Sequence, residues 1–347
     1  MAAANPASSG PLVSVIVPAR NEEVSLGACL ESLVAQTGVD REIIVVDDGS
    51  TDRTREIAQS FPEVRVISAP PLPAGWTGKN NAMAAGAREA RGEWLLFTDA
   101  DTVHQSGSLA RSVAEAQANA AALLSYSPEQ EVHGFWEKAV MPVIFAELAA
   151  TYQPSQVRDP SSTAAAANGQ YLLISRAAYE AVGGHVAIAS ELLEDVALAK
   201  AVKSSARKIF FRYGADAVRT RMYRSFAQLR EGWTKNLVLL FPSASRLATL
   251  RLTEFILIAG SLAAAILEGV LGRPQIGFAF SILFLALLIL LIVRVQKSHF
   301  PADTYLLTVL GLPIFSYLLL RSRLSYKHHK VQWKGRTYTG SLASRNL

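Results

Sequence analysis

The sequence predicts an α/β protein in which a parallel β-sheet domain is followed by membrane-spanning helices. Short apolar runs alternate with helical patterns over the first hundred residues, and two of these runs end directly in paired aspartates. Strands that alternate with helices form right-handed βαβ units and hence parallel sheets. The helices are predicted because the excess of apolar residues lies after about residue 250, in three long stretches.

Length and composition narrow the class of protein. The chain has 347 residues, room for two units, and its charged residues make up only 18%. A single cysteine, Cys29, excludes an intramolecular disulfide framework and a cysteine-rich zinc site. The net charge is +5, and basic residues crowd the region after the last apolar stretch. We therefore expect membrane lipids, and no nucleic acid, as the partner of that charge. Residues 1–10 are small and polar, so we expect disorder and no signal peptide there.

The strands and helices of the predicted sheet follow one another from residue 13. Val13–Val17 is an apolar strand that Pro18 should end, and Asn21 should cap the helix after it. Glu42–Val46 is the second strand. The later elements continue the alternation: a helix that buries Ile57, Ala58 and Phe61, a strand at Val64–Ile67, a helix from Asn80 to Ala90, and a strand at Leu95–Phe97.

Two of these strands end in pairs of acids. Asp47 and Asp48 follow the second strand, and Asp99 and Asp101 follow Leu95–Phe97. Ligands of open α/β sheets bind beyond the carboxyl ends of the strands. An Asp-x-Asp pair there suits a hard divalent cation that also holds a diphosphate. A helix-capping turn explains either pair alone, but its repetition at equivalent strand ends favours a binding site.

A loop rich in proline and glycine precedes the helix that begins near Lys79. Helix N-termini attract anions, and a lysine there is unfavourable unless an anion intervenes. We therefore interpret Lys79 as a diphosphate contact, with a solvated surface lysine as the alternative.

The middle of the chain continues the α/β pattern. A helix at 106–119 leads to a strand at 121–126, and residues 171–175 and 178–184 form a further strand and helix. The aromatic segment 134–145 is too short and too charged to cross a bilayer, so it is either an interfacial helix or an ordinary core helix. Glu194 and Asp195 open an amphipathic helix, a position where acids are favourable in any protein.

Four motifs in this order resemble family 2 glycosyltransferases of GT-A fold, over residues 11–235. The motifs are VSVIVPARNE at Val13–Glu22, IIVVDDGSTD at Ile43–Asp52, Gly78-Lys79, and TDAD at Thr98–Asp101. The proline-rich loop with Trp76–Lys79 is similar, more narrowly, to membrane glycosyltransferases of hopanoid or carotenoid pathways.

The resemblance implies a site and a chemistry. In the family, Asp-x-Asp holds Mg²⁺ or Mn²⁺ on the diphosphate, here through Asp99 and Asp101. A Glu-Asp pair about a hundred residues later supplies the base, here Glu194 and above all Asp195. Proton removal from a sugar acceptor needs such a carboxylate. The residues expected to bind the nucleotide-sugar are Pro18, Arg20, Glu22, Asp47, Asp48, Lys79, Asp99, Asp101 and Trp233.

A basic stretch follows the predicted domain. Processive relatives carry Gln-x-x-Arg-Trp here, whereas this chain has Gln228 and Trp233 without an arginine directly before the tryptophan. That difference argues against a polymerising synthase. Arg219, Arg221 or Arg230 could clamp a phosphate, or face lipid headgroups.

The membrane region is expected at residues 236–320, with candidate spans at 252–271, 275–293 and 304–320, and a basic tail at 321–347. About 20 apolar residues cross a bilayer. A nucleotide-sugar donor implies a cytoplasmic catalytic domain at the inner membrane. Three crossings would put the basic tail outside, against the positive-inside rule, so we expect the third segment to be re-entrant.

The sequence thus predicts an inverting glycosyltransferase that moves a sugar, from a UDP-sugar, to a lipid or lipid-linked acceptor. A processive polysaccharide synthase and a non-catalytic membrane protein that only binds nucleotide-sugar are the alternatives.

Overall fold

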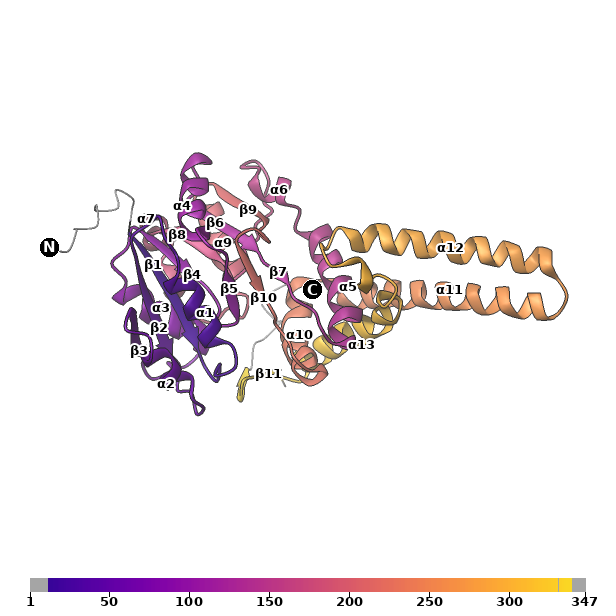
Figure 1. Cartoon of the computed structure of the whole chain (residues 1–347), viewed down its shortest axis with the longest axis horizontal. Helices are drawn as coiled ribbons and strands as arrows, with labels where there is room; N and C mark the ends of the chain where they lie inside the picture. Colours follow the sequence, from indigo (N-terminus) through magenta and orange to yellow (C-terminus); the bar gives the residue numbers. More distant parts are fainter. Residues whose placement is uncertain (1–11, 330, 339–347) are drawn as a thin grey trace. The chain divides into compact units, whose positions relative to one another are not determined.

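The computed structural model describes residues 12–329 and 331–338. Residues 1–10, expected to be disordered, and the last part of the basic tail lie outside the described residues. The chain divides into two compact units (Figure 1). Unit 1 comprises Met1–Glu131 and Tyr152–Arg221, and unit 2 comprises Val132–Thr151 and Met222–Leu347. The segment around 134–145 and the helix that carries Trp233 therefore belong to unit 2 and not to the sheet unit.

Unit 1 is built on a seven-stranded sheet of order β3-β2-β1-β4-β8-β6-β9. The strands are β1 Val13–Ala19, β2 Arg41–Asp47, β3 Val64–Ser68, β4 Trp94–Phe97, β6 Leu123–Ser127, β8 Leu172–Ser175 and β9 Ile209–Tyr213. The first four are parallel, as predicted, and so are β6 and β9.

The strand expected at 171–175 is β8, and it runs antiparallel to both β4 and β6, a direction that the sequence did not predict. Its first residue, Leu172, lies beside Phe97, the last residue of β4. The loop that enters β8 therefore lies at the edge where β4 ends. An apolar run of four residues carries no mark of strand direction, so the sequence could not give this reversal.

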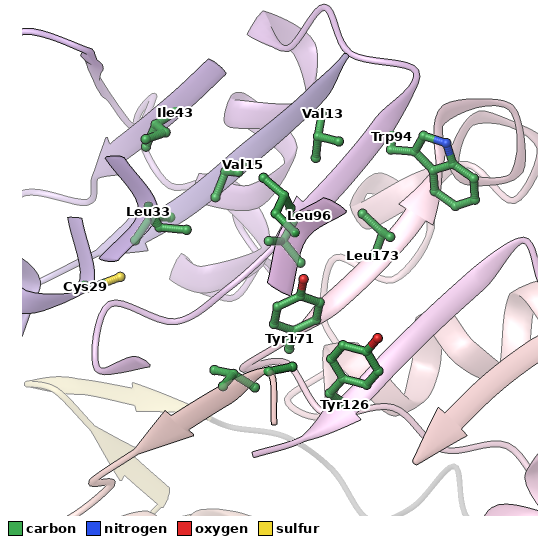
Figure 2. Packing of buried hydrophobic residues seen from close by; sticks show 14 of the residues in the cluster. Val13, Val15, Cys29, Leu33, Ile43, Trp94, Leu96, Tyr126, Tyr171 and Leu173 are labelled. Atoms are coloured by element: carbon green, nitrogen blue, oxygen red, sulfur yellow. The ribbon is translucent and has the colours of Figure 1, made fainter. Parts of the chain in front are cut away.

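Helices cover both faces of the sheet in unit 1. They are α1 Leu26–Val34, α2 Thr54–Gln59, α3 Gly78–Glu89, α4 Ser108–Ala118, α6 Pro154–Arg158, α7 Arg176–Ala181, α8 Gly184–Ala187 and α9 Glu194–Ser204. Successive strand residues point to opposite faces, so Val15 packs in one core and Ile16 in the other. Figure 2 shows the core that contains Val15, Cys29 and Tyr171. Cys29 is fully buried, as predicted.

The first turn differs from its prediction in two details. β1 continues through Pro18, which lies opposite Val46 in the parallel register. Asn21 does not cap a helix, because α1 begins only at Leu26. Asn21 instead has a φ of 54°, and its Oδ1 accepts a hydrogen bond from Thr51 N–H at 2.9 Å. The turn after β1 is thus tied to the loop after β2.

A second, small sheet in unit 1 follows the end of β4. It has the order β5-β10-β7, with β5 Thr102–His104, β10 Val218–Thr220 and β7 Glu129–Gln130. β5 begins one residue after Asp101, so this sheet fixes the loop that carries Asp99 and Asp101.

Where the structure describes it, unit 2 is helical apart from one short hairpin. Its elements are α5 Phe135–Thr151, α10 Phe226–Leu240, α11 Ala244–Val270, α12 Pro274–Gln296, η1 Ala302–Thr304, α13 Thr308–Lys327, β11 Val331–Trp333 and β12 Arg336–Tyr338. Within the described part of the chain, α11 and α12 are the two helices long and apolar enough to cross a membrane, with mean hydropathies of 1.8 and 3.1. Only 11% of the apolar 18-residue stretch of each helix is buried. The two helices lie side by side as an antiparallel pair (Figure 1).

The third predicted span, 304–320, corresponds to α13, which begins later and ends later than expected. α13 packs against α5, α10 and α11. Its Gly311 meets α5 so closely that an added Cβ would lie 1.8 Å from the carbonyl oxygen of Ala139. The middle of α5 is buried in this contact, whereas Phe135 and Trp136 at its start are 45% and 42% exposed. Most of the segment 134–145 is therefore a core helix of unit 2.

A network of four charged side chains joins α5, α11 and α12 inside unit 2. Arg251 Nε lies 2.9 Å from Glu147 Oε1, and Arg251 Nη1 lies 2.7 Å from Glu254 Oε2. Arg294 Nη2 lies 2.9 Å from the same Glu254 oxygen. All four side chains are at most 23% exposed. This network explains how an apolar helix accommodates Glu254, because two arginines neutralise the carboxylate.

Candidate active site

The turns after β1 and β2 form one side of the candidate site, within unit 1. Arg20 Nη1 donates to the carbonyl oxygen of Asp48 at 2.5 Å. Asp47 Oδ1 accepts from the backbone N–H of Ser50 at 3.0 Å, and Asp47 Oδ2 lies 3.3 Å from Arg55 Nη1. Asp47 therefore stabilises its own turn.

Pro18 and Glu22 frame the same turn. Pro18 is the penultimate residue of β1, and Glu22 N–H donates to Thr54 Oγ1 at 2.7 Å. Glu22 Oε2 accepts from Ser25 Oγ at 3.1 Å. Of the residues expected to contact the nucleoside, the structure thus brings Pro18, Arg20, Glu22, Asp47 and Asp48 together on the turns of β1 and β2.

Lys79 joins the Asp-x-Asp loop to the start of α9. Its Nζ lies 2.7 Å from Asp99 Oδ1 and 2.7 Å from Glu194 Oε1. The Lys79 and Asp99 side chains are 31% and 28% exposed, whereas that of Glu194 is 8% exposed. Burial alone would lower the pKa of Lys79, but the charges of Asp99 and Glu194 outweigh it and hold that pKa well above its usual value. Lys79 is thus a fixed cation between two carboxylates and not a solvated surface lysine.

Asp195 lies beside this group and accepts two backbone hydrogen bonds. Gly169 N–H donates to its Oδ2 at 2.9 Å, and Val196 N–H donates to its Oδ1 at 2.8 Å. Burial, and after it the charge of Glu194, raises the pKa of Asp195 to about 6. A carboxylate with such a pKa is ionised at neutral pH and is still basic enough to accept a proton.

The loop 168–170, at the start of the reversed strand β8, connects the two pairs of acids. Its Gly169 binds Asp195, and its Gln170 carbonyl accepts from Thr98 Oγ1 at 2.7 Å. Gln170 Nε2 donates to Thr220 Oγ1 at 3.3 Å, and that hydroxyl donates to the Asp101 carbonyl at 3.0 Å. Sequence reasoning missed Thr98, Gln170 and Thr220, because their partners are set by the direction of β8 and by β10.

Asn80 was also missed. Its side chain is fully buried and donates to the carbonyl oxygens of Ile188, Ala189 and Glu191 at 2.8–3.0 Å. α3 begins here with Thr77, whose Oγ1 accepts from Asn80 N–H at 3.2 Å. The start of α3 therefore fixes the segment that leads into Glu194. In the sequence, the one signal for this role was an asparagine at the start of a predicted helix.

Asp99 and Asp101 are suited to a shared metal site. No group of three or more histidine, cysteine, aspartate or glutamate side chains arranged for a metal occurs among residues 12–329 and 331–338. Mg²⁺ and similar hard cations commonly use one or two carboxylates and complete their shell with substrate phosphates and water. Two carboxylates at the end of β4, with Asp99 partly exposed, match that donor chemistry.

Trp233 lies in unit 2, in α10. It is 2% exposed, its Nε1 donates to Met141 Sδ at 3.4 Å, and its ring packs edge-on against Phe145. This surrounding is that of a core tryptophan in unit 2. Arg219, by contrast, lies in unit 1 and pairs with Glu131 at 3.3 Å.

Comparison with known proteins agrees with the motifs. Residues 14–183 match the family described as Glycosyl transferase family 2. The 4,4'-diaponeurosporenoate glycosyltransferase of Staphylococcus aureus strain USA300 is 31% identical over 233 residues, 65% of this chain and 60% of that protein. The relative of the same name in strain MRSA252 is 31% identical over 237 residues, with the same coverage. The chain therefore spans 60% of the length of these curated relatives.

A solved structure shares the fold across most of the chain. It is the mannosyltransferase PcManGT from Pyrobaculum calidifontis in complex with GDP-Man and Mn²⁺. The TM-score is 0.51, the identity is 18%, and the match covers 91% of this chain and 87% of that one. The predicted GT-A fold with C-terminal apolar helices is confirmed, as is the resemblance to family 2 and to a carotenoid-related member.

Proposed function

Because residues 14–183 match glycosyl transferase family 2, we propose that this chain is an inverting glycosyltransferase. It moves a sugar from a nucleotide-sugar, which we take to be a UDP-sugar, to a lipid or lipid-linked acceptor. One observation carries the proposal: Asp99, Lys79, Glu194 and Asp195 meet in one group at the carboxyl end of β4. A site for a diphosphate and a site for a base thus adjoin each other.

Asp195 is the base of the proposed reaction. Its carboxylate accepts the proton of the acceptor hydroxyl as that oxygen attacks the anomeric carbon. The new glycosidic bond forms as the bond from the anomeric carbon to the diphosphate oxygen breaks, and attack opposite the leaving group inverts the configuration. The N–H groups of Gly169 and Val196 hold the carboxylate in place throughout. No covalent enzyme intermediate is required.

Asp99 and Asp101 would hold Mg²⁺ or Mn²⁺, which when bound supplies charge neutralisation for the departing diphosphate. The nucleoside is assigned to the turns of β1 and β2, with Asp48 and the Pro18–Glu22 turn against it. Trp233 has no part in this proposal, because its surroundings in unit 2 account for it.

The membrane assignment rests on α11 and α12. We assign them as two crossings of the inner membrane, with the catalytic unit cytoplasmic, where nucleotide-sugars are made. With two crossings, the basic residues of α13 (Arg321, Arg323 and Lys327) also remain cytoplasmic, in agreement with the positive-inside rule. The lipid acceptor is supported by the apolar helices and by the carotenoid-related name of a curated relative.

The orientation can be tested with single cysteines and an impermeant thiol reagent on intact cells. Cys29 is buried and gives little background. A Leu271→Cys variant, between α11 and α12, should be labelled, whereas His328→Cys, after α13, should be labelled only once the cells are opened. Ready labelling of His328→Cys in intact cells would contradict the two-crossing arrangement.

The activity is tested by nucleotide release from membranes that contain the full chain. A panel of UDP- and GDP-sugars is offered with and without Mn²⁺ and with a total lipid extract. We expect metal-dependent release from one donor and a loss of at least about a hundredfold in Asp195→Asn. Asp40→Asn, a change of the same kind at an exposed position, is the matched control and should keep full activity.

Three results would revise the proposal. Growth of a product ladder would favour a processive synthase. Metal-dependent UDP binding without release, even with lipid extract, would favour a protein that only binds nucleotide-sugar. If neither UDP nor GDP binds, the assignment of a donor site is wrong.

A further inference from the structure

Lys79 contacts one of the two carboxylates assigned to the metal. Its Nζ lies 2.7 Å from Asp99 Oδ1, the distance of a direct ion pair. An ammonium group and a divalent cation on one carboxylate repel each other. A metal ion that arrives without a nucleotide must therefore bind against the charge of Lys79 or displace it from Asp99.

A diphosphate changes this balance, because it offers Lys79 another anionic partner. The start of α3 at Gly78 already favours anions through its backbone N–H groups and its dipole. Glu194 Oε1, 2.7 Å from the ammonium and on a buried side chain, holds Lys79 within reach of both partners. Lys79 can therefore exchange Asp99 for phosphate oxygens while its bond to Glu194 is kept.

We propose that Lys79 makes this site selective for the metal–diphosphate complex over the free metal ion. The inference rests on the proposed function for the identity of the donor site, and it adds a role for Lys79 beyond contact with the diphosphate. Without nucleotide, Lys79 occupies Asp99 and weakens metal binding. With nucleotide, Lys79 turns to the diphosphate and Asp99 becomes available to the metal.

The surroundings of Lys79 hold it in this position. Asn80, the next residue, is fully buried and bonded to the carbonyls of the segment before Glu194. Gly169 leaves room for the ammonium, since an added Cβ would lie 3.1 Å from Lys79 Nζ and 3.1 Å from Glu194 Oε1. Glu194 and Gly169 are therefore the fixed neighbours of the Lys79 ammonium group, and Asp99 is the exchangeable one.

The inference predicts two opposite changes in a Lys79→Met variant. Its affinity for Mn²⁺ without nucleotide should rise about fivefold or more, and its affinity for UDP with Mn²⁺ present should fall by at least a similar factor. The two effects together reduce the coupling between metal and nucleotide to the part that their direct contact supplies, and linkage requires that reduction to be reciprocal. If Lys79 merely supported the fold, its loss would weaken the binding of Mn²⁺ and the binding of UDP alike.

The experiment measures Mn²⁺ binding by the loss of the free-ion electron paramagnetic resonance signal, with the detergent-solubilised full chain. Wild type, Lys79→Met and Lys79→Arg are titrated with and without UDP, and again with GDP. Lys79→Arg keeps the charge and should not gain affinity for free Mn²⁺. Lys200→Gln removes an exposed lysine of α9 and should behave as wild type.

The outcomes separate this inference from the proposed function. Equal or weaker binding of free Mn²⁺ in Lys79→Met, with wild type still binding metal and nucleotide together, overturns the inference alone. A rise in that affinity supports it even if no donor in the panel is turned over. If the wild type does not bind Mn²⁺ in the presence of UDP and does not bind it in the presence of GDP, the donor site of the proposed function fails, and the inference fails with it. If Lys79→Met does not fold, the same rise is sought in Lys79→Gln.

Discussion

Replacement of Gly169 by alanine is the sharpest test of the candidate site, because one methyl group would enter the group of charged side chains. The added Cβ would lie 3.1 Å from Lys79 Nζ, 3.1 Å from Glu194 Oε1 and 3.6 Å from Asp195 Oδ2. The φ of Gly169 lies outside the left-handed region, so alanine introduces no backbone strain. The methyl group must instead move the two side-chain ends by a few tenths of an ångström.

That small displacement should affect activity more than stability. A misplacement of about 1 Å at a catalytic centre costs roughly a hundredfold in rate, so a few tenths of an ångström should lower kcat about four- to tenfold. Overpacking against two flexible ends costs about 1 kcal/mol, and replacement of glycine recovers about half of that from the unfolded state. The melting temperature should therefore fall by less than about 4 °C.

The assay is nucleotide release at saturating donor, paired with a thermal melt of each variant. Gly27→Ala, in the first turn of α1, is the matched control, since its Cβ would meet only Ile57 at 3.9 Å. It should keep full activity and gain slightly in stability. Unchanged kcat in Gly169→Ala would show that these side chains do not surround the reacting atoms. A melt lowered by more than about 8 °C would show that the methyl group presses on the backbone, against the packing argument.

Four further predictions follow from the structure. Because only the ionised form of Asp195 can accept a proton and its pKa is raised to about 6 in the ligand-free protein, kcat/KM should rise with pH through 6, with about one tenth of its plateau at pH 5; a kcat/KM profile flat down to pH 5 would exclude Asp195 as the base. Gly311→Ala should destabilise unit 2 by at least about 2 kcal/mol, since its Cβ would overlap the Ala139 carbonyl at 1.8 Å, and a melt equal to wild type in detergent would contradict that contact. Arg251→Met should cost about 3 kcal/mol by the same melt, because it leaves the two buried carboxylates of Glu147 and Glu254 with Arg294 as their one remaining arginine, and Glu147→Gln in addition should recover part of it. UDP at a hundred times its Kd with Mn²⁺ should stabilise the chain by about 2.7 kcal/mol, and removal of the metal with EDTA should abolish that gain; a gain that survives EDTA would refute the metal assignment.

Strand polarity explains why one half of the site could be predicted. The apolar runs of β1, β2 and β4 alternate with helices, which makes the strands parallel, and parallel strands end at one edge. Asp47, Asp48, Asp99 and Asp101 follow these strands directly in the sequence. Their gathering at that edge therefore follows from local pattern alone.

The other half of the site depends on long-range packing. Glu194 and Asp195 come about a hundred positions after Asp99, and in the sequence they resemble any acidic helix start. Only the resemblance to a family assigned them a role. The structure brings them to Lys79 through the bonds of Asn80 to the segment 188–191 and through Gly169.

The membrane region shows the same division. Hydropathy alone located α11 and α12, because a long apolar helix is a local property of the chain. It could not show that Glu254 is neutralised by Arg251 and Arg294, or that α13 packs on α5 through Gly311. Those features depend on partners from other helices.

The sequence by itself therefore determined the sheet of β1 to β4, the edge at which the paired aspartates lie, and the two apolar helices. Each of these features follows from the periodicity of apolar residues and from residues that are adjacent along the chain. Only the tertiary structure decided the direction of β8, the two carboxylate partners of Lys79 and the backbone N–H that holds Asp195. Those contacts join residues far apart in the sequence, and they form only when the reversed strand brings its loop to the edge where β4 ends.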